Sequence, residues 1–225
     1  MAALAERGIW LPDAADRADL LTFTERALRL DETAVVRLRT RSETALVAWA
    51  ATGFDVLAGR VLTGQLRPRD LSCAADALSR ALAAEVDESG YLDPGYGMDS
   101  AWRGGLPPDD GFVHLEDVPA RVILDLAQRG SVLAREHGRT PVSLLDQEVV
   151  SVRSGDQAVG IPMRCVLALT AMGFLPQSTG GDDLAPESVG ADEIVRVRVQ
   201  PSWLRLDARY GSVYRRRGDA ALVLN

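Results

Sequence analysis

Two stretches of alternating residues decide the fold: Glu193-Ile-Val-Arg-Val-Arg-Val199 and Trp203-Leu-Arg-Leu-Asp-Ala-Arg-Tyr210. Val or Leu takes nearly every second position, and charged residues, mostly Arg, lie between them. This period of two is typical of a β-strand with one buried face. We therefore expect a β-hairpin whose arginines project together, away from the hydrophobic interior.

Arginine also alternates with apolar residues over 34–41, so we expect antiparallel sheet in both halves. The expected strands are 34–41, 44–51, 54–63, 112–115, 193–199, 203–210 and 212–217. Apolar residues at helical spacing predict helices between them. The expected helices are 14–30 with Asp13 as N-cap, 70–85 with Ser72 as a cap, 118–137, 141–150 and 163–174. The fold class is therefore α+β, with helices packed on the sheets.

Residues 86–111 differ from the rest, because they are rich in Gly, Pro, Asp and Tyr and show no regular period. Such a stretch is either an interdomain linker or an ordered functional loop. We expect an N-terminal α-β-β-β-α subdomain over 1–86, an acidic loop or linker over 87–111, and a C-terminal helical and β-hairpin subdomain over 112–225. The order of elements in the last of these also permits a winged-helix fold.

All 25 basic residues are arginine, since the chain contains no lysine. Schiff-base chemistry, a P-loop phosphate lysine and a lysine general base are therefore impossible. The chain has two cysteines and two histidines, placed singly at Cys73, Cys165, His114 and His137. Structural zinc usually needs four such ligands in tight pairs. We expect no metal site and no cofactor, and we assign no catalytic residue.

Charge is distributed unevenly, although the net charge is only −7. Residues 193–217 hold seven arginines and two acidic residues, whereas residues 85–117 hold nine acidic residues and one arginine. The arginine face could bind an anionic small molecule or a partner protein, because guanidinium groups suit phosphates and carboxylates. The expected binding residues are Arg37, Arg39, Arg196, Arg198, Arg205, Arg209 and Tyr210. The structural alternative is a face paired across strands with Asp and Glu, or packed against the acidic loop.

We therefore expect a non-catalytic binding or structural protein that engages an anionic ligand or a partner protein through this face. Nucleic acid is a weaker expectation, because an isoelectric point near 4.9 opposes binding by phosphate neutralisation. Two alternatives stay open: an enzyme with a cleft between the halves and the acidic loop as its lid, and a winged-helix DNA-associated protein. A homodimer that shares sheet edges is also allowed.

The N-terminus carries Glu6 where a signal peptide needs an apolar stretch. The longest apolar run, 165–175, is too short to span a bilayer. Two cysteines make no disulfide framework, which suits a reducing compartment. We therefore expect a cytoplasmic protein without a membrane partner.

The stretch from Trp203 to Arg217, together with Ala171-Met-Gly-Phe-Leu175 and Trp102-Arg-Gly-Gly-Leu-Pro-Pro108, resembles a family of uncharacterised bacterial proteins from high-GC genomes. The resemblance extends along most of the chain. That family has no assigned activity, so the resemblance supplies no site residues. It adds weight to a dedicated role for Arg205, Asp207, Arg209 and Tyr210, which would also suit a structural ion-pair ladder.

Overall fold

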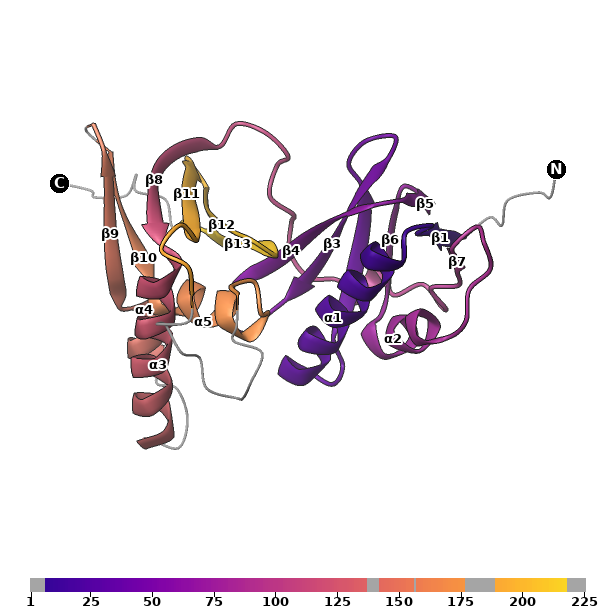
Figure 1. Cartoon of the computed structure of the whole chain (residues 1–225), viewed down its shortest axis with the longest axis horizontal. Coiled ribbons are helices and arrows are strands. Elements are labelled where there is room, and N and C mark those ends of the chain that lie inside the picture. The colour runs from indigo at the N-terminus through magenta and orange to yellow at the C-terminus, as the bar shows by residue number, and fades with distance from the viewer. Residues whose placement is uncertain (1–6, 137–141, 156, 177–188, 218–225) are drawn as a thin grey trace. The chain divides into compact units, whose positions relative to one another are not determined.

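The computed structural model describes residues 7–136, 142–155, 157–176 and 189–217 (Figure 1). The chain divides into two compact units. Unit 1 comprises Met1–Gly53 and Gly59–Asp109, and unit 2 comprises Phe54–Ala58 and Asp110–Asn225. Both units combine helices with antiparallel sheet, which confirms the expected α+β class.

Unit 1 is a sheet with two helices and a second, smaller sheet. Strands β6, β2, β3 and β4 are neighbours in that order, and β2 is antiparallel to both β3 and β6. The first two residues of β4 belong to unit 2. The elements are β1 (Gly8–Trp10), α1 (Ala14–Leu30), β2 (Val35–Thr40), β3 (Ala45–Ala51), β4 (Leu57–Thr63), β5 (Gln65–Arg67), β6 (Asp70–Ala74), α2 (Ala75–Ala83), β7 (Tyr91–Leu92) and the 3-10 turn η1 (Asp99–Ala101).

The first helix begins where the sequence predicts. Asp13 is its N-cap, and the Asp13 carboxylate accepts a hydrogen bond from the Ala15 amide at 2.7 Å. Leu20, Phe23 and Ala27 recur at helical spacing and are buried, as an amphipathic helix requires. This buried face fixes how α1 packs, and α1 contacts α2 within unit 1.

The helix expected over 70–85 is only partly correct. Residues 70–74 form β6 and pair with β2, so the helix begins at Ala75. Ser72 lies in this strand and caps nothing; the N-cap residue is Ala74, whose side chain cannot accept a hydrogen bond. Pairing along an existing strand has overridden the helical spacing of the apolar residues.

Residues 87–109 of the acidic loop (87–111) belong to unit 1. Within it β7 pairs with β1, and β1 also pairs with β5, which makes the second sheet. Gly90 has a φ of +67°, and its carbonyl accepts a hydrogen bond from the Leu11 amide at 2.9 Å. A Cβ at Gly90 would lie 2.2 Å from the Leu11 carbonyl oxygen, so only glycine fits here.

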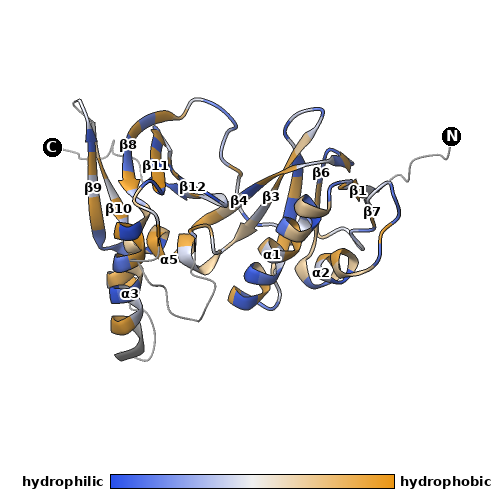
Figure 2. Cartoon of the chain, viewed as in Figure 1, coloured by the Kyte–Doolittle hydropathy of each residue, from blue (hydrophilic) through white to orange (hydrophobic). Residues whose placement is uncertain are grey.

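Unit 2 is a sheet with helices and a separate β-hairpin. Strands β13, β12, β11 and β8 are neighbours in that order, and each neighbouring pair is antiparallel. Apolar and polar residues alternate along α3 (Figure 2), which packs on α5. The elements are β8 (Val113–Pro119), α3 (Ala120–Glu136), α4 (Val142–Asp146), β9 (Glu148–Ser154), β10 (Gln157–Pro162), α5 (Met163–Ala171), β11 (Ile194–Gln200), β12 (Trp203–Ala208) and β13 (Gly211–Arg216).

The helix expected over 141–150 is only partly correct. Its only helical part is α4, after which β9 and β10 form an antiparallel hairpin. Val149, Val150 and Val152 are β-branched, which favours a strand once a partner strand is available. Because this hairpin separates α4 from α5, unit 2 does not have the three consecutive helices of a winged-helix fold, and that part of the expectation is wrong.

The two units share one pattern of helices. Each has a helix of 17 residues, α1 or α3, and a later helix of 9 residues, α2 or α5. In both units the shorter helix follows a strand with no residue between them. Among the described residues, no helix has the length and apolar character needed to cross a membrane.

Candidate functional site

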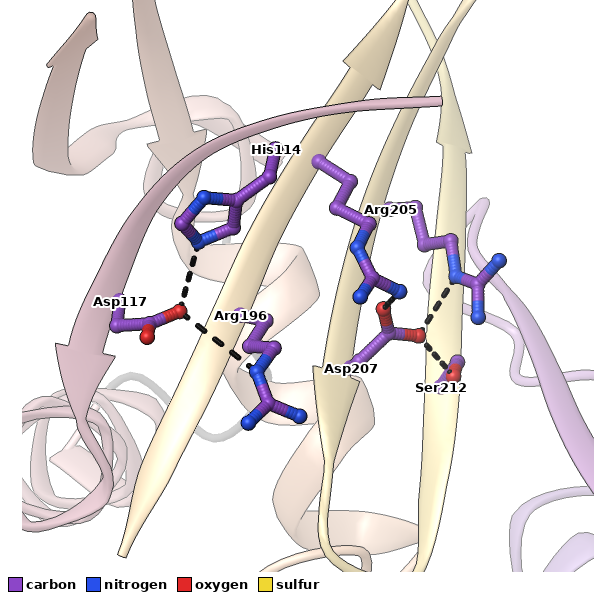
Figure 3. A network of polar contacts seen from close by, with 7 residues as sticks. His114, Asp117, Arg196, Arg205, Asp207 and Ser212 are labelled. Atoms are coloured by element: carbon purple, nitrogen blue, oxygen red, sulfur yellow. Dashed lines mark hydrogen bonds and ion pairs between the residues drawn. The ribbon is translucent and has the colours of Figure 1, made fainter. Parts of the chain in front are cut away.

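Arg196, Arg198 and Arg205 lie on strands β11 and β12 and share a face of the sheet in unit 2. Strand pairing places Arg198 of β11 opposite Arg205 of β12, and Arg196 opposite Asp207. Residues directly opposite each other project from the same face of an antiparallel pair (Figure 3). The valines and leucines between them are buried, so the expected alternation of the hairpin is present.

Asp207 is the centre of this face. Its carboxylate accepts hydrogen bonds from Arg198 Nη1 at 2.5 Å, from Arg205 Nε at 2.6 Å and from the Ser212 hydroxyl. The Asp207 side chain is only 14% exposed. This largely buried carboxylate therefore compensates the charges of two guanidinium groups, which would otherwise repel each other across the two strands.

Arg205 is also enclosed by aromatic rings. Its Cζ lies 5.3 Å from the ring centroid of Tyr214 and 5.6 Å from that of Phe112. Both distances are within the range of a cation–π interaction. The Arg205 guanidinium is thus stacked and paired, and it does not present an open cation to a ligand.

Arg196 has a more distant partner. Its Nε lies 4.0 Å from the Asp117 carboxylate of β8, and that carboxylate also contacts His114 Nε2 at 2.8 Å (Figure 3). The neighbouring carboxylate of Glu116 does not join this group. It accepts a hydrogen bond from the backbone amide of Arg153 in β9 at 3.2 Å.

Arg209 pairs with the Glu193 carboxylate just before β11. This hydrogen bond is the main cause of a raised pKa at Arg209. The Arg209 guanidinium also lies over the Tyr210 ring, with Cζ 5.9 Å from the centroid. Tyr210 is exposed, and its backbone amide donates to the Phe174 carbonyl at 3.1 Å.

The arginines of β2 belong to unit 1 and are paired there. Arg37 donates from Nε and Nη2 to the two oxygens of Asp70, both at 2.8 Å, and this bidentate contact raises the pKa of Arg37. Arg37 Cζ lies 5.8 Å from the Trp102 ring centroid, and Arg39 Nη2 lies 4.0 Å from the Asp109 carboxylate. Trp102 and Asp109 come from the acidic loop, which therefore supplies partners to β2.

Of the seven expected binding residues, five belong to unit 2 and two to unit 1. Each of the six arginines contacts a carboxylate of its own unit. The structural alternative, a face paired across strands and with the acidic loop, describes this geometry.

The cysteines are buried in the two units. Cys73 lies in β6, and its Sγ contacts the Val36 carbonyl at 3.7 Å; Cys165 lies in α5. Burial raises the pKa of both thiols to about 12, so both stay protonated and neither is a nucleophile at neutral pH. Groups of three or more potential metal ligands do not occur among the described residues. His137 lies outside those residues.

Sequence reasoning missed the most enclosed charge of unit 2. Arg164 of α5 is 7% exposed, and no other charged residue in the described part of the chain is buried. Its Nη2 donates to Asp146 Oδ1 at 2.6 Å, and Arg215 Nη2 donates to the same oxygen at 3.2 Å. Its Nη1 donates to the Phe54 carbonyl at 2.6 Å. The available signal was a single arginine within the apolar stretch 163–174.

Two family models match the chain. Residues 4–104 match a domain of unknown function (DUF8010), and residues 107–220, half of the chain, match another domain of unknown function (DUF8185). The chain belongs to the DUF8185 family. This confirms the uncharacterised family indicated by the three sequence motifs, and no curated protein matches the chain.

The DUF8185 chain is also similar to solved structures of DNA polymerase sliding clamps. The clamp of Caulobacter crescentus matches with a TM-score of 0.52 at 11% identity over 96% of this chain. The clamp of Bacillus subtilis matches with 0.53 at 12% identity, and the DNA polymerase beta subunit of Streptococcus pyogenes with 0.54 at 10% identity, each over 97% of this chain. The chain spans 66% of the first protein and 67% of the other two. This likeness establishes a clamp-like fold.

The expected function is therefore corrected. A module that engages an anion or a partner through an arginine-bearing sheet face is wrong, because the fold is that of sliding clamps and the arginines are paired within each unit. The winged-helix alternative does not describe this fold either.

Proposed function

We propose that this DUF8185 chain is a clamp-like scaffold that associates with DNA and with proteins that act on DNA. The fold likeness supports this best, because it extends over 96% to 97% of the chain and includes both units. The neighbours are named as DNA polymerase sliding clamps and as a DNA polymerase beta subunit. At 10% to 12% identity no individual residue role is carried over.

The charge of the chain limits how such an association would work. The net charge is −7, and the arginines of both sheet faces contact carboxylates. Binding through neutralisation of phosphates needs free cationic side chains and falls steeply with salt. Association by this chain should therefore depend on its assembly around DNA or on partner proteins, and its affinity for a short free duplex should be low.

The test uses the native chain in the cells that produce it. Formaldehyde crosslinking followed by isolation of chromosomal DNA should recover the chain at least tenfold above an abundant acidic enzyme of similar size. Nuclease digestion before crosslinking should remove the enrichment. A recovery equal to that of the control enzyme would show that the chain is not associated with DNA in the cell.

A measurement with purified components complements this test. The chain should bind a fluorescent 30-base-pair duplex weakly even at low salt, whereas a nicked circular plasmid incubated with the chain in cell extract should retain it. Cutting that plasmid once should release the chain, because a clamp can leave through a free end. Retention that is unchanged after cutting would contradict a clamp-like mode of association.

A further inference from the structure

The segment Phe54–Ala58 belongs to unit 2, although it follows β3 in the sequence and includes the first two residues of β4. Val56 and Ala58 are buried. Asp55 has a φ of +58°, a left-handed conformation that is uncommon for a residue with a side chain. Such a conformation is favoured where surrounding contacts determine it, and the Asp55 carboxylate lies 3.8 Å from Arg164 of unit 2.

Arg164 makes a side-chain contact to this segment. The Nη1 atom donates to the Phe54 carbonyl at 2.6 Å and lies 3.8 Å from Asp55 Oδ2. The Nη2 atom donates to Asp146 at 2.6 Å, so a single guanidinium connects the segment to α4 and α5. Arg215 of β13 donates to the same Asp146 oxygen, which extends the connection to the sheet.

The segment 54–58 supplies unit 2 with a hydrogen-bond acceptor for Arg164 and with buried apolar side chains. A buried guanidinium is costly unless its donors are hydrogen-bonded. Without residues 54–58, Arg164 loses the Phe54 carbonyl, and unit 2 loses the buried side chains of Val56 and Ala58. The part of the chain that begins at residue 107, where the DUF8185 match begins, contains neither the carbonyl nor these side chains.

We propose that Arg164 is a clasp that holds Phe54–Ala58 in unit 2, and that the DUF8185 domain cannot fold without this segment. The segment lies within 4–104, the part matched by the other family model. The boundary between the two matches is therefore not a folding boundary. The two domains must occur in one chain, or as two chains that bind each other through this segment. This inference does not depend on the proposed function.

Hydrogen exchange in the full-length chain tests the clasp. Arg164→Lys keeps the charge but loses the planar fork that reaches both the Phe54 carbonyl and Asp146. The amides of 54–58 should exchange at least about tenfold faster in this variant, and those of β11 and β12 should also accelerate. The amides of β2 and β3 in unit 1 should change much less.

A matched arginine variant serves as the control. Arg80 is exposed on α2 and pairs with Asp76 of the same helix at 2.9 Å. Arg80→Lys should leave exchange at 54–58 unchanged. Val56→Ala provides a second variant that removes packing instead of the clasp, and it should accelerate exchange at 54–58 in the same way as Arg164→Lys.

The decisive quantity is the acceleration at 54–58 divided by that at β2 and β3. A ratio of ten or more in Arg164→Lys supports the clasp, even if the whole chain loses some stability. A ratio near one would mean that the amides of 54–58 accelerate no more than those of β2 and β3, and it would overturn the inference.

Discussion

The two units pair their arginines in different ways. In unit 1, Arg37 has its own carboxylate, Asp70, and the two side chains are 27% and 41% exposed. In unit 2, Arg198 and Arg205 share Asp207, which is largely buried. The same alternation of Arg with Val or Leu thus gives an independent surface pair in one unit and a coupled cluster in the other. Loss of one carboxylate should therefore affect the two units unequally.

The largest effect is expected for Asp207→Ala. This change leaves Arg198 and Arg205 facing each other in a partly buried place, so the free energy of unfolding should fall by about 3 kcal/mol. Urea denaturation followed by circular dichroism measures the loss. Asp207→Asn keeps a hydrogen-bond acceptor and should lose less. A loss no larger than that of Asp70→Ala would break the comparison.

The next effect concerns Gly211, the first residue of β13, which follows the turn at 209–210. A Cβ at Gly211 would lie 2.5 Å from the Phe174 ring, so Gly211→Ala should cost roughly 2 kcal/mol through overpacking. A Cβ at Gly97 of the acidic loop would meet Asp99 at 3.4 Å, an ordinary contact. Gly97→Ala should therefore be nearly neutral in the same denaturation assay. Equal losses at both glycines would mean that the turn is less tightly packed than the structure indicates.

A smaller effect is expected for Asp70→Ala in unit 1. Exposed ion pairs contribute little, so the loss should be about 1 kcal/mol at low salt. It should shrink further in 1 M sodium chloride, because salt screens exposed charges. The loss from Asp207→Ala should respond less to salt. A salt response that is the same for both variants would show that the two pairs have similar solvent access.

At neutral pH the smallest effect is expected from the thiols, one in each unit, because both are protonated in the folded and in the unfolded chain. With pKa values of about 12, Cys73 and Cys165 should not react with a disulfide reagent at pH 8 in the native chain, and both should react in urea. Unfolded thiols ionise near pH 9.0, so the unfolded chain binds fewer protons between pH 9 and 12. Stability should accordingly fall as pH rises through this range. Rapid reaction of Cys165 alone would show that unit 2 opens before unit 1.

Local patterns predicted the elements that depend on neighbouring residues. The alternation over 34–41 and 193–210 gave strands, and Asp13 gave the start of α1. Local patterns could not predict which carboxylate or carbonyl each arginine contacts. Arg37 and Asp70 are 33 residues apart, and Arg164 and Phe54 are 110 residues apart. Periodicity shows which face carries a charge, but the fold of the whole unit decides which carboxylate meets it.

The failures over 70–74 and 148–150 have a common cause. Both segments have apolar spacings that suit a helix, and both form strands because a neighbouring strand offers its backbone, β2 in one case and β10 in the other. The clamp-like architecture was also out of reach, because no single motif marks it. It follows from the order of strands within each unit.

The contact between Glu116 and the Arg153 amide has a consequence for how the molecule behaves in a crowded solution. Among the described residues, β9 forms a two-stranded sheet with β10. Each of these strands therefore has one edge that is not paired with another strand of that sheet. Backbone amides along such an edge are what a strand from another molecule would bind. The Glu116 carboxylate occupies one such donor and adds a negative charge there, so we expect it to disfavour pairing of this edge with a strand from another molecule.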